Sequence, residues 1–282
     1  MRSALAIALI VAAIGCKRSG PPAPAVVAAA DAPVAGVDAA AAAVAASDAS
    51  GTRTVRIPDD TRELVVAVVP GWDATAATLT HWRRDDGGAW SAVGGSWPAV
   101  IGARGAAWGR GVHGDGAPDG RAGPRKREGD GRSPAGIFAI GPAFGYAAAP
   151  LPATRVAYTA VTPTWRCVDD PTSAHYNRVL DEAGVAKDWT SAEDMKRGDA
   201  LYQWVVEVGH NPAAAPGDGS CIFLHVWSGP GSGTAGCTAM ARPALERLLV
   251  ALDPAARPMF VLLPAAEVAA LGSAWGLPPI AP

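Results

Sequence analysis

The sequence lacks an excess of charge of either sign. Its 24 lysine and arginine residues are balanced by 26 aspartate and glutamate residues, which gives a formal net charge of −2. A chain with this balance has no general electrostatic attraction to the phosphates of nucleic acid. We therefore expect no nucleic-acid partner.

Cysteine is scarce, and the few that are present stand far apart. They are Cys16, Cys167, Cys221 and Cys237. None of them belongs to the closely spaced Cys-x-x-Cys pairs that are typical of zinc sites. A metal site that combines the last three with His210 and His225 is therefore not expected, and nothing else in the sequence implies a cofactor.

Long apolar runs are also missing. After Arg2, the uncharged residues 4–14 are too few to span a bilayer and end at small residues, which is typical of a secretory signal. Residues 13–16, Ala-Ile-Gly-Cys, resemble a bacterial lipobox, in which the cysteine is lipidated and becomes the new N-terminus. We therefore expect residues 1–16 to be a lipoprotein signal peptide with Cys16 lipidated. A plain signal peptide with an incidental cysteine is the alternative.

The segment after the expected anchor has no aromatic residue and no sustained alternation of polar and apolar residues. Residues 17–52 are mostly alanine, proline and valine. Because such a stretch has little to bury, it cannot offset its ordering entropy, and we expect a flexible tether. Lys17, in place of aspartate after the cysteine, resembles lipoproteins sorted to the outer membrane. The expected location is thus the periplasmic face of the cell envelope, anchored to the membrane through the lipid.

Residues 53–282 form the expected folded domain. An apolar content of 49% excludes wholesale disorder, while 33 glycines and 25 prolines indicate many loops. Short β-type runs between glycine clusters predict strands at residues 64–69, 77–82, 89–93, 99–101, 202–208 and 221–227. In the fifth of these, alternation places Tyr202 on the same face as Trp204.

Helices are expected to be few and peripheral. Thr190 and Glu193 can form a capping box, which predicts a helix through Lys196. Prolines open two further apolar-periodic runs, at residues 243–252 and 264–272. The pattern as a whole predicts a mainly β domain with a few peripheral helices.

Candidate catalytic residues concentrate between residues 210 and 240. His225 lies in a predicted strand, a glycine-rich loop follows, and Cys237 ends that loop just before a predicted helix. A histidine on a strand and a cysteine on a tight loop can meet in space, which an activated thiolate requires. Gly236 lets the backbone turn and leaves amides to face an oxyanion. The N-terminus of the following helix is expected to lower the thiol pKa.

These residues resemble the catalytic domain of L,D-transpeptidases, whose signature is a histidine, a loop and Ser/Thr-x-Gly-Cys. Here His225 is followed by Thr-Ala-Gly-Cys, which ends at Cys237. The resemblance includes residues 126–138, which end in Ser-Pro-Ala-Gly-Ile-Phe, and it covers about residues 126–263. Further similar segments are residues 165–171, 176–177 and 209–211.

The resemblance implies a β-sandwich or barrel and acyl transfer on peptidoglycan stem peptides. Cys237 as thiolate would attack the carbonyl of the L-centre residue before a terminal D-alanine, and His225 would take up and return the proton. The amides of Gly236 and Cys237 would stabilise the oxyanion, and a carbonyl near Val226 would orient His225. An inert thiol and a satisfied buried histidine are the alternatives.

Five residues are weaker candidates for contacts with substrate. They are His210, Asn211, Tyr176, Asn177 and Thr234. A histidine that ends a strand is as often a packing residue, and for Glu128 and Asp130 a solvated loop is the default. Ala235 and Ala239 replace the histidine and arginine of commoner family members, and the eleven-residue loop before Cys237 is shorter than usual. We therefore expect the contacts with substrate to differ.

Two cysteines remain once Cys16 and the expected nucleophile are set aside. An even pair in an oxidising compartment is more often bridged than free, so we expect a disulfide between Cys167 and Cys221. The expected function is L,D-transpeptidation, which forms cross-links or attaches an amine acceptor. A peptidoglycan L,D-carboxypeptidase or amide hydrolase is one alternative, and a catalytically silent wall-binding lipoprotein is another.

Lipidation of Cys16 can be tested by fractionation. Changing Cys16 to serine removes the acceptor sulfur, so the mature protein should move from the membrane to the soluble envelope fraction. Immunoblotting of the two fractions gives the result. A wild-type protein that is already soluble would contradict the anchor.

Overall fold

The computed structural model describes residues 55–280, so the expected signal peptide, Cys16 and the tether lie outside the described residues. The strands are β1 (Glu63–Val69), β2 (Ala76–Arg83), β3 (Ser91–Ala92), β4 (Trp97–Val100), β5 (Ala106–Trp108), β6 (Arg110–Gly111), β7 (Gly114–Asp115), β8 (Ser133–Gly145), β9 (Tyr158–Ala160), β10 (Trp165–Val168), β11 (Val179–Asp181), β12 (Ala192–Asp194), β13 (Trp204–Val208), β14 (Phe223–Val226), β15 (Thr238–Met240) and β16 (Met259–Pro264). The helices are α1 (Arg242–Ala251) and α2 (Ala265–Trp275), with short 3₁₀ turns η2 (Glu182–Gly184) and η3 (Pro254–Ala256).

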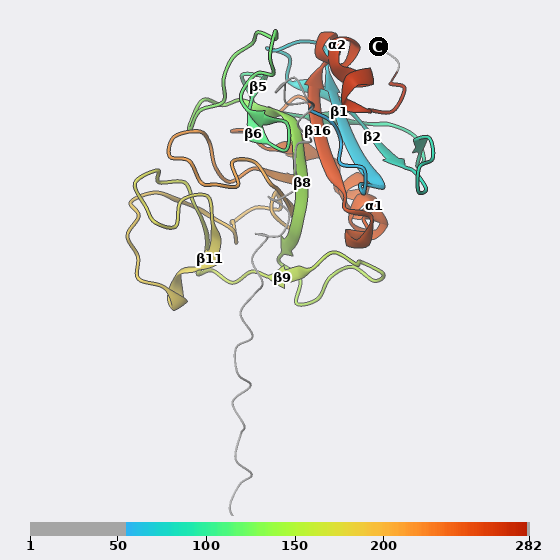
Figure 1. Cartoon of the computed structure of the whole chain (residues 1–282). Coiled ribbons are helices and arrows are strands. Elements are labelled where there is room, and N and C mark those ends of the chain that lie inside the picture. The colour runs from blue at the N-terminus through green and yellow to red at the C-terminus, as the bar shows by residue number, and fades with distance from the viewer. Residues whose placement is uncertain (1–54, 281–282) are drawn as a thin grey trace, which may run out of the picture. The chain divides into compact units, whose positions relative to one another are not determined.

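Eight of these strands close into a barrel. Their order is β1-β16-β8-β13-β14-β15-β4-β2, and β2 pairs with β1 again. The pairs β1–β16 and β14–β15 are parallel, and the other pairs of the ring are antiparallel. Figure 1 shows β1, β16 and β8 side by side, with the red helices near the ends of β16. The prediction of a mainly β domain with a few helices is confirmed.

The parallel strands β1 and β16 are apolar except for Glu63, the first residue of β1, because both of their faces are covered. All residues of β16 are buried, and α2 packs against β16 and β1. Helix α1 lies on β13 and β14 and buries Leu245, Leu248 and Leu249 along one stripe. The two helices predicted at residues 243–252 and 264–272 are therefore confirmed. Neither they nor any other helix within residues 55–280 is long and apolar enough to cross a bilayer.

The helix predicted for residues 190–196 is wrong. The Asp170 carboxylate accepts the Thr190 amide and hydroxyl hydrogens, each at 2.7 Å, so Thr190 cannot cap a helix. The residues that follow instead form β12, in which Glu193 pairs with Cys167 of β10. A long-range carboxylate has thus displaced a local capping pattern.

A second, three-stranded sheet is joined covalently to the barrel. Its order is β11-β10-β12, and part of its yellow segment is labelled in Figure 1. Cys167 of β10 forms a disulfide with Cys221, which lies two residues before β14. The predicted pairing is confirmed, and the bond fixes β10 beside the strand that carries His225.

Loss of this disulfide should destabilise the domain. The bond closes a loop with a sequence separation of 54. The Cys167→Ala/Cys221→Ala variant should therefore lose about 3 to 4 kcal/mol of unfolding free energy, because the unfolded chain regains loop entropy. Urea denaturation of wild type and variant measures the loss. Equal midpoints and slopes for the two proteins would contradict the prediction.

Candidate active site

A cavity of about 380 Å³ is lined jointly by the barrel and the three-stranded sheet. Cys237 and His225 line it from the barrel side, and Glu193 lines it from β12. Tyr202, just before β13, contributes to the same wall. The structure therefore brings the two predicted catalytic residues into one cavity and adds two that the sequence analysis did not select.

The position of Cys237 is fixed by hydrogen bonds to its backbone. The Ser133 hydroxyl donates to the carbonyls of Gly236 and Cys237, at 2.6 and 3.0 Å, and accepts the Gly102 amide hydrogen at 2.9 Å. The close packing of the backbone at position 102 requires glycine, since a Cβ there would lie 2.4 Å from the Gly131 carbonyl oxygen. Strand β8 therefore holds the end of the cysteine loop in place.

The thiol of Cys237 is buried and surrounded by backbone groups. Its Sγ accepts the Phe223 amide hydrogen at 3.3 Å and lies 3.4 Å from the Cys221 carbonyl oxygen, to which the thiol donates. Burial, followed by the negative charge of Glu193, raises the thiol pKa to about 12. The prediction that the N-terminus of the following helix lowers the thiol pKa is wrong. Strand β15 separates Cys237 from α1, and the field of a helix end falls off within one turn.

His225 is held by the backbone, as the family resemblance implies. Its Nδ1 lies 2.8 Å from the Val226 carbonyl oxygen. Because a carbonyl only accepts, Nδ1 carries the hydrogen and Nε2 of the neutral ring keeps its lone pair. Burial lowers the pKa of His225 to about 4. Within residues 55–280, no hydrogen bond joins the His225 and Cys237 side chains directly.

The two amides predicted to stabilise an oxyanion differ in their surroundings. The Gly236 amide donates to the Thr234 hydroxyl at 3.1 Å, and that hydroxyl donates to the Cys237 carbonyl at 2.6 Å. To bind the Gly236 amide, an oxyanion would have to displace the Thr234 hydroxyl from it. Otherwise the oxyanion would bind the Cys237 amide. Thr234 lines the cavity, but its hydroxyl is engaged in shaping the cysteine loop.

Tyr202 and Glu193 are the site residues that the sequence analysis missed. The Tyr202 hydroxyl donates to Glu193 at 2.7 Å, and the Tyr202 ring lies 5.2 Å from the His225 ring in an edge-on arrangement. Tyr202 packs in the cluster that contains Cys237, whereas Trp204 packs in the main core. The shared face predicted for Tyr202 and Trp204 is therefore wrong, because β13 begins only at Trp204.

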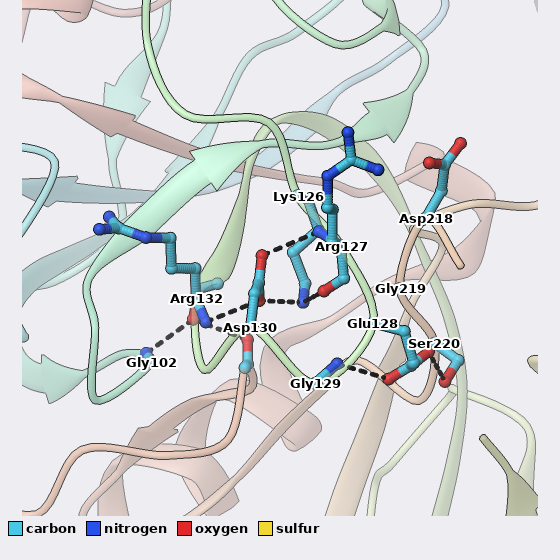
Figure 2. A network of polar contacts seen from close by, with 12 residues as sticks. Gly102, Lys126, Arg127, Glu128, Gly129, Asp130, Arg132, Asp218, Gly219 and Ser220 are labelled. Atoms are coloured by element: carbon cyan, nitrogen blue, oxygen red, sulfur yellow. Dashed lines mark hydrogen bonds and ion pairs between the residues drawn. The ribbon is translucent and has the colours of Figure 1, made fainter. Parts of the chain in front are cut away.

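A ring of polar contacts forms the wall next to the cysteine loop. Figure 2 shows Asp130 between the Lys126 side chain and the Arg132 backbone. The Asp130 carboxylate accepts a hydrogen bond from the Lys126 ammonium at 2.5 Å and another from the Arg132 amide at 2.9 Å. Glu128 accepts the Ser220 hydroxyl hydrogen at 2.6 Å. The expected solvated loop is found only in part: Arg127 and Gly129 are exposed, whereas Lys126 is buried and Glu128 lines the cavity.

His210 and Asn211 support backbone rather than facing the cavity. His210 accepts the Arg110 amide hydrogen at Nδ1 and donates from Nε2 to the Asp218 carbonyl, and burial lowers its pKa to about 3. The Asn211 amide group donates to the carbonyls of Ala215 and Gly219 at 2.9 and 3.0 Å. Neither residue lines the cavity, so their position does not support contact with substrate.

Tyr176 and Asn177 likewise act within the protein. The Tyr176 hydroxyl donates to Glu128 at 2.5 Å, and burial raises the pKa of that hydroxyl. The Asn177 side chain donates to the carbonyls of His210 and Asn211 and accepts the Cys221 amide hydrogen, each at 2.9 Å. These residues hold the segment before β14 in place, so their position supports a structural role rather than the predicted contact with substrate.

Comparison with known proteins adds no assignment. No family model matches the chain, and a search of curated proteins finds no match. The chemistry of the cavity must therefore be judged from its own side chains.

The Ser133 hydroxyl should be important for the site. Ser133→Ala removes the partner of the Gly236 carbonyl and of the Gly102 amide, while the Cys237 carbonyl keeps the Thr234 hydroxyl, so the unfolding free energy should fall by about 1 to 3 kcal/mol. Hydrogen exchange should also become faster around residues 234–238. Denaturation and exchange measured by mass spectrometry test both effects, with the exposed Ser191→Ala as control. Exchange at these residues that matches the control would contradict the prediction.

Proposed function

We propose that this protein is a cysteine acyltransferase, an L,D-transpeptidase that acts on peptidoglycan stem peptides. The observation that carries the proposal is the shared cavity, which His225 lines from β14 and Cys237 from the residue just before the parallel strand β15. The disulfide consumes Cys167 and Cys221, so within the described residues Cys237 is the one free thiol. A single thiol beside a neutral histidine is the arrangement that nucleophilic catalysis requires.

In the proposed reaction, the Cys237 sulfur attacks the carbonyl of the L-centre residue that precedes a terminal D-alanine. A thioester forms, and D-alanine leaves with a proton. An amine of a second stem then attacks the thioester and restores the thiol, while His225 exchanges protons at Nε2. The Cys237 amide, and the Gly236 amide once Thr234 has moved, stabilise the tetrahedral oxyanion.

The charges of the cavity fit a substrate with charges of both signs. Glu128, Asp169 and Glu193 supply carboxylates to the lining, while Lys126 and Arg197 supply cations. A stem peptide carries both amino and carboxylate groups, so each end has a partner of opposite charge nearby. This lining suits a zwitterionic peptide better than a purely apolar ligand.

We propose a place in the periplasm, with a lipid on Cys16 anchoring the protein to the outer membrane. The disulfide between Cys167 and Cys221 supports an oxidising compartment, because such bonds do not persist in a reducing cytosol. The anchored chain would then meet peptidoglycan on the side of the membrane where the wall lies.

One observation favours the catalytically silent alternative. The buried Cys237 has a thiol pKa of about 12, so the neutral thiol predominates at rest. A cysteine in this state reacts slowly unless a neighbouring group removes its proton. An assay must therefore separate an inert wall-binding protein from an enzyme.

Product analysis separates these functions. The purified protein is incubated with tetrapeptide muropeptides and excess amine acceptor, and we expect cross-linked dimers by mass spectrometry. Cys237→Ala should abolish the product, and His225→Ala should slow its formation by about two orders of magnitude or more. His175→Ala is the matched control, because His175 packs against Trp189 and does not line the cavity.

Each other outcome selects an alternative. Tripeptide without dimers would replace the transferase by the hydrolase. Binding of muropeptides without any product would indicate the silent wall-binding protein.

A further inference from the structure

Two cations line the cavity beside Cys237, and they differ in how accessible they are to a ligand. The Lys126 ammonium donates to the Asp130 carboxylate at 2.5 Å and to the Arg127 carbonyl at 2.6 Å, and only 4% of its side chain is exposed (Figure 2). Arg197 lies between β12 and β13, and 37% of its side chain is exposed. A ligand in the cavity can therefore reach the Arg197 guanidinium more readily than the Lys126 ammonium.

The Arg197 guanidinium is held in place, but one of its edges stays open. The Asp199 carboxylate accepts hydrogen bonds from Nε at 3.1 Å and from Nη2 at 3.0 Å, and it also accepts the Leu201 amide hydrogen at 3.0 Å. The Arg197 amide donates to the Tyr146 hydroxyl at 3.1 Å, so both ends of the residue are fixed. Nη1 makes no hydrogen bond to another residue within residues 55–280. The donors of Nη1 are therefore available to a ligand.

Another arginine of this chain shows that such a guanidinium can bind a second carboxylate. Arg166, in β10 of the three-stranded sheet, binds Glu182 through Nη2 at 2.7 Å and Asp194 through Nη1 at 3.0 Å. A guanidinium has five N–H donors in a rigid fork, so one carboxylate does not exhaust it. Arg197 can therefore keep Asp199 and bind the carboxylate of a ligand through Nη1.

Arg197 also lies at a suitable distance from the reacting groups. Its guanidinium carbon is 5.1 Å from the centre of the Tyr202 ring, and that ring is 5.2 Å from the His225 ring, so the guanidinium is within about 10 Å of His225. One residue spans about 3.8 Å along a peptide, and a charged hydrogen bond adds about 3 Å. A carboxylate one residue beyond the attacked carbonyl can thus reach Nη1 while that carbonyl lies beside His225.

The other charges of the lining favour the same position for a carboxylate. Glu128, Asp169 and Glu193 line the cavity and would repel a negative group beside them. Because Lys126 is enclosed by its own partners, Arg197 is the lining cation that can offset this repulsion. Attraction at one place and repulsion elsewhere fix the direction in which a peptide binds.

We propose that Arg197 binds the C-terminal carboxylate of the stem peptide and thereby selects substrates that end in a free carboxylate one residue beyond the attacked carbonyl. Asp199 is a positioning residue, because it holds the guanidinium and does not touch the substrate. A C-terminal amide of similar shape carries no charge and loses the ion pair. The inference deepens the proposed function and rests on it, because it takes the L-centre carbonyl as the one that Cys237 attacks.

Binding to a protein that cannot turn over its substrate tests the role of Arg197. The full-length Cys237→Ala protein is titrated by calorimetry with a tetrapeptide muropeptide that ends in a free carboxylate, and with the same muropeptide ending in an amide. The acid should bind about tenfold more tightly than the amide, or better, because the amide forms no charged hydrogen bond.

Two substitutions of Arg197 separate a direct contact from a structural role. In the Cys237→Ala background, Arg197→Gln should lower the affinity for the acid by about tenfold or more and leave the affinity for the amide unchanged. Arg197→Lys keeps the charge but not the fork, so it should retain part of the preference for the acid. A merely structural role would weaken the binding of both ligands alike.

Arg155→Gln in the same background is the matched control. Arg155 also binds one carboxylate, that of Asp253 at 2.7 Å, and it does not line the cavity. The control should keep the full preference for the acid. Thermal melting of every variant shows that it is folded.

Several binding results would overturn the inference. Equal affinities for acid and amide would show that no cation recognises the carboxylate. A preference that survives in Arg197→Gln would assign the carboxylate to another group, and an equal loss for both ligands would assign Arg197 a structural role. Absence of binding by either ligand would overturn the inference as well.

The product assay with the wild-type protein keeps this inference apart from the proposed function. Cross-linked dimers without a preference for the acid in the binding experiment would reject the role of Arg197 and leave the transferase standing. The expected preference without any product from the wild-type protein would reject the transferase and leave the carboxylate site.

Discussion

The Ser133 hydroxyl is the contact on which the arrangement of the site depends. Through it, the first residue of β8 binds the carbonyls of Gly236 and Cys237 and the amide of Gly102 at the end of β4. Since β4 pairs with β15, this one buried group joins three strands of the barrel at the point where the cysteine loop enters β15. The rigid wall of the barrel thereby sets the position of the sulfur.

Much of the fold could be predicted from local sequence because its strands and helices are marked by local patterns. The run in β1 is β-branched and apolar, and α1 has a leucine stripe after a proline, so both are recognisable without any partner. The pair of Cys237 and His225 was found for a similar reason. A glycine next to a cysteine and a histidine on an apolar strand are short-range signals, even though the two side chains come from different segments.

The rest of the site depends on contacts that no local pattern records. Thr190 and Glu193 fit a capping box, yet Asp170 binds Thr190, and Glu193 is free to reach Tyr202. Asn177 and His210 are polar residues near the motif, which suggested contact with substrate. Their partners are buried backbone groups more than thirty residues away or in neighbouring loops, and only the folded chain reveals that these groups need partners.

The disulfide connects this polar site to the stability of the domain. Cys167 is bonded to Cys221, whose carbonyl accepts the Cys237 thiol, and Cys167 also pairs with Glu193 across β10 and β12. The disulfide therefore connects the strand pair that carries Glu193 to the residue whose carbonyl contacts the Cys237 sulfur. Without the bond, the three-stranded sheet would no longer be fixed covalently beside β14, and the wall of the cavity that holds Glu193 would lose this constraint. The surroundings of Cys237 therefore depend on oxidation of Cys167 and Cys221, while the Cys237 thiol itself stays free.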